Sequence, residues 1–351
     1  MFNNNIDLYK MLSLADGVAG RESEVREIIK KSVDSTNLKT WQDNFGNFYV
    51  QTKYNNSKKI MICAHMDEVG FLVKHITEDG FIYMQPLGGW WGHVLLGQNV
   101  TITSRKSGEK FRGVIGTTPS KGYNPDRVIE PSAMYVDIGA ENIDAIIAMG
   151  IQPGDMITPY TIPEKLLDNN YLLGKAWDDR VNCGVLVHVM NEISNLSLKH
   201  YDIVGVGTAQ EEVGTRGAKI AAETICPDIA IVLDVATAKD TPGADIYKNR
   251  ILGRGPGISL YDKTAISSLE LTDTIIEIAK DNNIPFQYDM LAGGGTDAGV
   301  IHISNGGIPT AVLTLGVRYC HSGASIVHMG DVEKMIELIL QVIIELDKCS
   351  M

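Results

Sequence analysis

The sequence has few cysteines and no spacing that favours pairing them. Its 351 residues include five cysteines, an odd number, and no two of them form a Cys-x-x-Cys motif. Scattered cysteines of this kind argue against a disulfide framework. The first ten residues, MFNNNIDLYK, also lack the basic and apolar regions of a secretory signal. We therefore expect a cytoplasmic protein.

Long apolar runs and positive charge are also scarce. No uncharged stretch of about 18 apolar residues occurs, so we expect no segment to span a membrane. Lys and Arg number 31 against 43 Asp and Glu, which gives a net charge of −12. A surface of that sign repels nucleic acid and anionic lipid. We expect neither a nucleic acid nor a membrane as a partner.

The remaining composition is that of a folded protein with more than one domain. Hydrophobic residues make up 44% and charged residues 21% of the chain, close to globular averages, and the length favours two domains. Continuous apolar runs typical of strands buried on both faces lie at 60–64, 203–208, 229–233 and 310–315. Helical periodicity separates them, at 181–193, 266–280 and 332–346. This alternation predicts an α/β fold with a central sheet flanked by helices.

Residues 70–163 have a different pattern. Short alternating strands, separated by Gly, Pro and polar turns, are predicted at 71–76, 81–87, 99–104, 111–116, 133–139 and 155–160. Such a series is typical of a small all-β barrel. We therefore expect an inserted β-barrel domain at 70–163, which divides the α/β domain into residues 1–69 and 164–351.

Charged and imidazole side chains lie at or just beyond four predicted strands. They are His65, Asp67, Glu211, Glu212, Asp234 and His321. Ligands of open α/β sheets bind at the carboxyl ends of the strands, and this nitrogen and oxygen set suits Zn²⁺, Co²⁺ or Mn²⁺. Any one carboxylate can instead be a helix cap or a solvated turn. Their accumulation at four strand ends favours a metal site.

The adjacent pair Glu211 and Glu212 is the least easily explained by structure alone. Two neighbouring carboxylates repel each other, and at the end of a buried strand they need cations to offset that repulsion.

Three other features each have more than one interpretation. The glycine-rich loop at 293–297 is a plain turn or a site wall. Trp90 and Trp91 are a sugar platform, a subunit contact or, as we expect, a core pair. Cys320 is a thiol nucleophile or, as we expect, a packing residue.

Seven segments occur in the order of one known family. They are AHMDEVGF (64–71), GGWWGHVLLGQNV (88–100), GKAWDDR (174–180), AQEEVGTRGA (209–218), LDVATAKDTPG (233–243), GGTDAG (294–299) and RYCHS (318–322). The sequence resembles the dinuclear metallo-aminopeptidases that include glutamyl and deblocking aminopeptidases and form tetrahedral particles. The resemblance covers nearly the whole chain. It implies a zinc-exopeptidase-like fold, with a mixed central sheet and an inserted barrel.

The resemblance also assigns the metal ligands. It implies that His65 and Asp234 bind one divalent ion and that Glu212 and His321 bind a second. Asp178, in the WDDR motif, would bridge the two. Two metal ions per chain are therefore expected, with Zn²⁺ and Co²⁺ as the first choices.

Further roles follow from the same resemblance. Glu211 would be the general base and acid, acting on a water shared by the two metals. Asp67 would hydrogen-bond the His65 imidazole and fix its orientation. The substrate-site wall would include Gly294, Gly295 and Thr296. The implied activity is the release of N-terminal residues from short peptides, and the implied assembly is a dodecamer built from dimers through the 70–163 insert.

Three rival functions remain at this point. A glycoside hydrolase, a label that some relatives carry, needs only a carboxylate pair and leaves both histidines unexplained. A carboxypeptidase or deacylase would use the same dinuclear core. A non-catalytic assembly scaffold would not need an intact ligand set. The preferred N-terminal residue, the physiological metal, and the choice between dimer and dodecamer are left open by the sequence.

Overall fold

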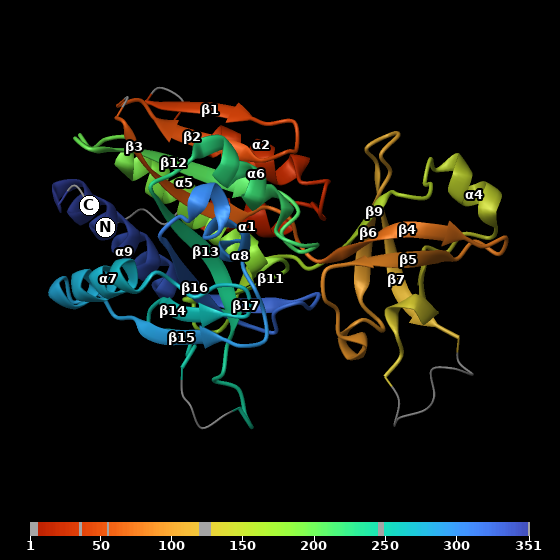
Figure 1. Cartoon of the computed structure of the whole chain (residues 1–351). Coiled ribbons are helices and arrows are strands. Elements are labelled where there is room, and N and C mark those ends of the chain that lie inside the picture. Colours follow the sequence, from red (N-terminus) through yellow and green to blue (C-terminus); the bar gives the residue numbers. More distant parts are fainter. Residues whose placement is uncertain (1–5, 35–36, 55, 119–127, 245–248, 350–351) are drawn as a thin grey trace.

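The computed structural model describes residues 6–34, 37–54, 56–118, 128–244 and 249–349. These residues form a large α/β part with a mixed sheet and a smaller closed barrel that stands to one side of it (Figure 1). The predicted fold class, with its inserted barrel, is confirmed. Within the described residues no helix has the length and apolar character needed to cross a membrane.

The α/β part is built on an 11-stranded sheet with a parallel centre. That centre consists of β3 (Lys58–His65), β12 (Tyr201–Thr208), β13 (Ile229–Thr237) and β16 (Thr310–Arg318). The order is β1-β2-β12-β3-β13-β16-β17-β11-β10, with β14 and β15 joined to β16. The other strands are β1 (Leu38–Gln42), β2 (Phe48–Thr52), β10 (Glu164–Lys165), β11 (Tyr171–Gly174), β14 (Gly257–Asp262), β15 (Gln287–Leu291) and β17 (Ser325–His328).

Helices cover both faces of this sheet. Ile60 and Ile62 of β3 belong to one buried apolar cluster, and Met61 and Cys63 belong to another on the opposite face. This is why the strand reads as a continuous apolar run. The first cluster includes α1 (Ile6–Leu14), α2 (Ser23–Ser32), α5 (Trp177–Ile193), α7 (Leu269–Asp281) and α9 (Met329–Cys349), and the second includes α6 (Arg216–Ile225) and α8 (Ala298–Ile301).

The barrel closes in the order β4-β5-β8-β7-β6-β9. Its strands are β4 (Gly70–Ile76), β5 (Ile82–Leu87), β6 (Asn99–Thr103), β7 (Lys110–Thr117), β8 (Met134–Asp137) and β9 (Met156–Pro159). A short helix, α4 (Ile143–Ala148), lies beside it, with Asn142 as its N-cap. Alternate residues of the strands fill a separate apolar core inside the barrel, as the period-2 pattern requires.

The two tryptophans beside the barrel have different environments. Trp90 stacks on Phe71 at 4.9 Å, and its indole N–H donates to the carbonyl of Gly70 at 3.2 Å. Trp91 is 65% exposed. The interpretation of both as a core pair is therefore correct for Trp90 and wrong for Trp91.

Two central strands are longer than predicted. The sequence placed their ends at 233 and 315, where the apolar runs stop, but β13 continues to Thr237 and β16 to Arg318. The parallel ladder between them continues through the pair Asp234 and Thr314. Backbone pairing with a neighbour, rather than side-chain polarity, sets these strand ends. The short or edge strands β1, β10, β11, β14, β15 and β17 were not predicted.

A buried ion cluster joins the barrel to the α/β part. The Lys175 ammonium lies 2.7 Å from Glu68 Oε1 and 3.2 Å from Asp16 Oδ1. The Arg180 guanidinium lies 3.1 Å from the same Glu68 oxygen. Lys110, on barrel strand β7, lies 2.8 Å from Asp16 Oδ2. Of the five residues, only Lys110 is substantially exposed, so these charges can be buried only because they neutralise one another.

Asp16 gives this cluster a pH-dependent stability. Burial alone would raise the pKa of Asp16, but the nearby Lys175 and Lys110 charges and the hydrogen bonds from Lys110 and Thr158 lower it from 3.8 to about 2. Because the pKa is lower in the folded state, the stabilisation is complete above about pH 4 and is lost as the pH falls through about 2. A shift of this size corresponds to ~2 kcal/mol.

We therefore expect Asp16→Asn to reduce the free energy of unfolding by ~2 kcal/mol at pH 7. The gap from wild type should narrow as the pH is lowered from about 4, since Asp16 itself becomes protonated there. Urea unfolding at a series of pH values measures this. The control is Asp79→Asn, in the exposed turn between β4 and β5, which should behave as wild type. A gap that stays constant down to about pH 2 would contradict the assignment.

Candidate metal centre

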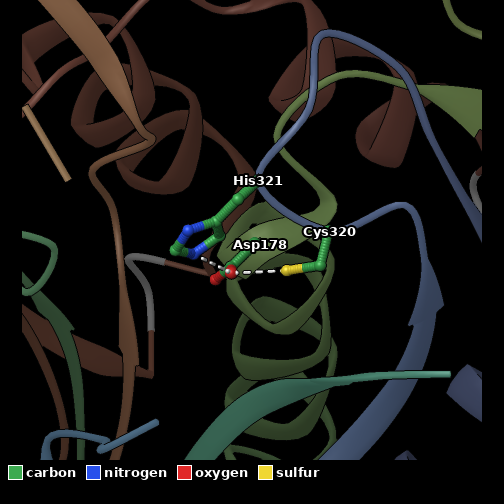
Figure 2. Close-up of side chains that lie close together, drawn as sticks. All are labelled: Asp178, Cys320 and His321. Carbon is green, nitrogen blue, oxygen red and sulfur yellow. Dashed lines mark hydrogen bonds and ion pairs between the residues drawn. The ribbon is translucent and has the colours of Figure 1, made fainter. Parts of the chain in front are cut away.

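Asp178 is the centre of the predicted site. Its Oδ1 lies 3.0 Å from His65 Nε2, and its Oδ2 lies 3.2 Å from His321 Nε2. His65 is the last residue of β3, Asp178 lies in the first turn of α5, and His321 follows β16. Figure 2 shows Asp178 facing His321. One carboxylate therefore contacts imidazoles from two separate strand ends.

The other predicted ligands surround this carboxylate. His65, Asp178 and Asp234 each offer a donor atom, and these atoms lie within 4.8 Å of one another. Glu212 Oε1 lies 3.6 Å from His321 Nε2. Asp234 lies inside β13 rather than beyond its end. The structure thus brings all five predicted ligands to one place.

The turn after β12 orients the two adjacent glutamates. Gln210 has a left-handed backbone with φ of 60°. The amides of Glu211 and Glu212 then both donate to the Asp67 carboxylate, at 2.9 and 3.1 Å. Glu211 Oε2 lies 4.0 Å from His65 Nε2. Asp67 thus fixes the backbone that carries both glutamates.

Asp67 contacts His65 mainly through its backbone. Its carbonyl oxygen lies 3.0 Å from His65 Nδ1, and its carboxylate Oδ1 lies 3.7 Å from the same nitrogen. A carbonyl accepts a hydrogen bond, so Nδ1 carries the proton and Nε2 is the nitrogen that faces Asp178. The His65 ring is therefore oriented by the residue that also positions Glu211 and Glu212.

His321 is oriented by the loop between barrel strands β5 and β6. Its Nδ1 lies 2.8 Å from the carbonyl oxygen of Gly89. Tyr319 and His321 both have left-handed backbones, with φ of 62° and 56°. This turn, rather than an extended strand, aims the imidazole at Asp178.

Burial raises the pKa of the carboxyl groups around the site. Burial and the Asp178 charge raise the pKa of Glu212 to about 8. The same two causes raise the pKa of Asp234 well above its usual value. Burial, together with the charges of Asp234 and Glu212, does the same to Glu211. The protein alone therefore supplies too little positive charge to keep all these carboxyl groups ionised.

The pKa values of the two histidines are raised as well, which favours the charged form of each imidazole. Burial alone would lower the pKa of His65 and of His321, but the hydrogen bond from each to Asp178 outweighs it. The pKa of His321 rises to about 10, and that of His65 rises well above its usual value. Although burial opposes it, the two imidazoles hold the pKa of Asp178 well below its usual range. Protons on the histidines supply the positive charge that divalent ions would supply.

The residues present fit a divalent metal centre. Glu212 Oε1 is buried and has no hydrogen-bond partner among the described residues. The donors are imidazole nitrogens and carboxylate oxygens, the set that Zn²⁺, Co²⁺ and Mn²⁺ share. Cations at this position would satisfy the unpartnered oxygen and relieve the repulsion among the carboxylates.

The site opens into a cavity of about 580 Å³. Its lining includes all five predicted ligands and Glu211, together with Trp91, Gly294 and Gly295. Thr296 is fully buried instead, and its hydroxyl donates to Asp262 at 2.8 Å. The glycine-rich loop thus forms a wall of the cavity. The Thr296 side chain points away from the cavity lining and anchors the loop to Asp262.

Two buried aspartates of the site, Asp179 and Asp297, were not predicted. Asp179 accepts hydrogen bonds from the amide of His65 at 3.3 Å and from Asn182 at 2.6 Å. Asp297 accepts from the Thr208 hydroxyl at 2.6 Å, and burial raises its pKa to about 6. Both lie in motifs quoted above, WDDR and GGTDAG. The available signals were that Asp179 is adjacent to Asp178 and that Asp297 is the one charged residue of its motif.

Comparison with known proteins identifies the family of this chain. The family model described as M42 glutamyl aminopeptidase matches residues 46–338. The chain belongs to the M42 glutamyl aminopeptidase family. It is therefore a peptidase of the aminopeptidase type, and the resemblance that its seven motifs carry is confirmed. M42 enzymes are metallopeptidases, in keeping with the donor set described here.

Individual M42 relatives align over nearly their whole length. The chain is 32% identical to the glutamyl aminopeptidase of Lactococcus lactis, over 93% of this chain and 92% of that protein. It is 34% identical, with a TM-score of 0.90, to the TET aminopeptidase from the marine sediment archaeon Thaumarchaeota archaeon SCGC AB-539-E09, over 96% and 95% of the two chains. The Pyrococcus horikoshii TET1 peptidase, described as assembling into a tetrahedron or a large octahedral shell, is 29% identical with a TM-score of 0.85, over 96% and 98%.

We expect Asp178→Ala to lose bound divalent metal together with activity. Asp178 is the carboxylate that contacts both histidines, so its removal takes away the one group shared by the His65 side and the His321 side of the ligand set. Elemental analysis after gel filtration, beside hydrolysis of an aminoacyl anilide, measures both effects. The matched control, Asp202→Ala, replaces a buried aspartate near the start of β12. This control should keep its bound metal. An Asp178→Ala protein with the metal content of wild type would show that Asp178 is not a metal ligand.

Proposed function

We propose that this chain removes N-terminal residues from short peptides with the help of two divalent ions. His65 and Asp234 would hold one ion, Glu212 and His321 the other, and Asp178 would bridge them. The support is the position of Asp178 between the two imidazoles. Zn²⁺ and Co²⁺ suit these donors best. When bound, such ions polarise a scissile carbonyl and make water easier to deprotonate.

Glu211 would move the protons of the reaction. Its carboxylate lines the cavity, and burial raises its pKa well above the usual value. A carboxylate with a raised pKa is a better base, and once protonated it is a ready acid. Glu211 would take a proton from the attacking water and pass it to the departing amine. Since Asp67 anchors the amides of Glu211 and Glu212 alike, one glutamate can ligate while the other transfers protons.

The rival functions receive less support. A glycoside hydrolase needs two carboxylates, and it gives no role to imidazoles that both contact Asp178. A carboxypeptidase or deacylase would use the same metals but would not require a free amino group on the substrate. A scaffold would not need a pocket lined by every proposed ligand.

The compartment and the insert belong to the same proposal. We propose the cytoplasm, because the four cysteines whose side chains are described, Cys63, Cys183, Cys226 and Cys320, are free thiols. We also propose that residues 70–163 form a domain that serves self-association. Large apolar side chains are exposed there, namely Trp91, Leu96, Val114, Val128, Ile147 and Ile162, and such surface favours a protein partner.

Glu211→Gln should abolish turnover and leave the metal content unchanged. The substitution keeps the size and the backbone anchor of the side chain but removes its ability to accept a proton, and such groups contribute about 10²–10⁴-fold to rates. Metal analysis and kcat on an aminoacyl anilide measure the two effects. The matched control, Glu223→Gln, changes an exposed glutamate on α6.

Two outcomes would count against this proposal. Activity of Glu211→Gln within tenfold of wild type, or loss of metal in that variant, would remove Glu211 from proton transfer. Equal cleavage of a peptide and of its N-acetylated form would replace the aminopeptidase with a deacylase or carboxypeptidase.

Self-association predicts a large particle in solution. Multi-angle light scattering of the metal-loaded protein should give about twelve times the 38.3 kDa mass of one chain, since a solved relative with 29% identity is described as a dodecamer. Ile162→Asp, which adds a charge to a side chain that is 63% exposed, should reduce this mass. A single-chain mass for wild type would exclude the interface, and a dimer would keep the interface without the particle.

A further inference from the structure

We propose that Cys320 is a sulfur ligand of the metal ion that Asp178 and His321 hold. The inference rests on the proposed metal centre and adds a donor to it. Cys320 Sγ lies 2.9 Å from Asp178 Oδ2, the oxygen that also lies 3.2 Å from His321 Nε2 (Figure 2). The three donor atoms all lie within 4.8 Å of one another. One side of the centre is thus a nitrogen, oxygen and sulfur set.

The local backbone explains how two consecutive residues face the same carboxylate. On an extended strand Cys320 and His321 would point to opposite faces, which is why the sequence favoured packing for Cys320. β16 ends at Arg318, however, and both Tyr319 and His321 have a left-handed backbone. Cys320 contacts the apolar core beneath it, and in this turn its thiol still reaches Asp178.

A second observation points to a cation at the same position. The Glu212 side chain is 5% exposed, and its Oε1 lies 3.6 Å from His321 Nε2. That oxygen is buried and has no hydrogen-bond partner within the described parts of the chain. A buried carboxylate oxygen of this kind is costly unless a positive charge satisfies it. Four side chains with donor atoms that bind metals therefore lie close together, namely Asp178, Cys320, His321 and Glu212.

Position distinguishes Cys320 from the other described cysteines. Cys320 lines the main cavity and a smaller neighbouring one. Cys63 is fully buried inside strand β3. The thiol of Cys183 donates to the carbonyl oxygen of His65 at 3.1 Å, and Cys226 is exposed at the end of α6. Among these four, only Cys320 offers sulfur to the proposed ligand carboxylates.

The bonding step is a simple exchange. The Cys320 S–H bond breaks, its proton passes to solvent, and a sulfur–metal bond forms without any change of oxidation state. Thiolate sulfur favours softer ions such as Zn²⁺, Co²⁺ and Cd²⁺ over Mn²⁺ and Mg²⁺. Cys320 would therefore narrow the metal preference of this side of the centre.

Cobalt spectroscopy tests the assignment directly. The full chain, freed of metal with a chelator, is titrated with Co²⁺ while near-ultraviolet absorbance and bound cobalt are recorded. A thiolate bound to Co²⁺ gives an intense charge-transfer band, so wild type should show that band and Cys320→Ser should not. Affinity for Co²⁺ should fall at least ~10-fold in Cys320→Ser, because loss of a residue that only hydrogen-bonds a metal ligand already lowers affinity by that factor. Affinity for Mn²⁺ should change less.

Matched variants make each outcome decisive. Cys226→Ser, at an exposed position, should keep the band. A band that survives in Cys320→Ser but disappears in Cys183→Ser would assign the sulfur elsewhere and overturn the proposal. Cobalt bound to wild type without any band would overturn the sulfur ligand and leave the metal centre intact. No bound cobalt at all would overturn both, which separates the two failures.

Discussion

The gathering of carboxylates around two imidazoles in a buried place is the constraint on which the rest of this structure depends. Left alone, Asp178, Glu211, Glu212 and Asp234 would repel one another in a poorly solvated pocket. The fold holds them there by fixing their backbones. Parallel strands bring their carboxyl ends to one edge, and Asp67 ties the two glutamate amides together. The stability of the scaffold thus maintains an arrangement that favours bound cations.

A second charge cluster supports the first from behind. Arg180 donates to the carbonyl of Met66 at 2.7 Å and to Glu68, and so grips the chain on both sides of Asp67. Arg180 also follows Asp178 by two residues in the same motif. The cluster that joins the barrel to the sheet therefore also fixes the backbone of the candidate metal centre. The same Arg180 contacts thus neutralise a buried charge and fix the geometry of the site.

Much of this arrangement could be predicted from the sequence, because buried parallel strands read as apolar runs and the polar residues at their ends stand out. His65, Glu211 and Glu212 are of this kind. Asp234 was placed beyond a strand that in fact contains it, since ladder pairing extends past the apolar run. Asp178 came only from the family resemblance. The orientation of Cys320 and the separate environments of Trp90 and Trp91 depend on left-handed turns and tertiary contacts, which leave no periodic signal.

The hydrogen bond between Gly89 and His321 has a consequence for how such enzymes diversify. Gly89 follows barrel strand β5, yet its carbonyl orients an imidazole carried by the α/β sheet. The barrel therefore contributes a contact to the candidate metal centre. Because a backbone carbonyl makes this contact, the path of the chain at Gly89, rather than a side chain, orients the ring nitrogen of His321. Sequence change in this loop is therefore compatible with the site as long as the backbone keeps that path.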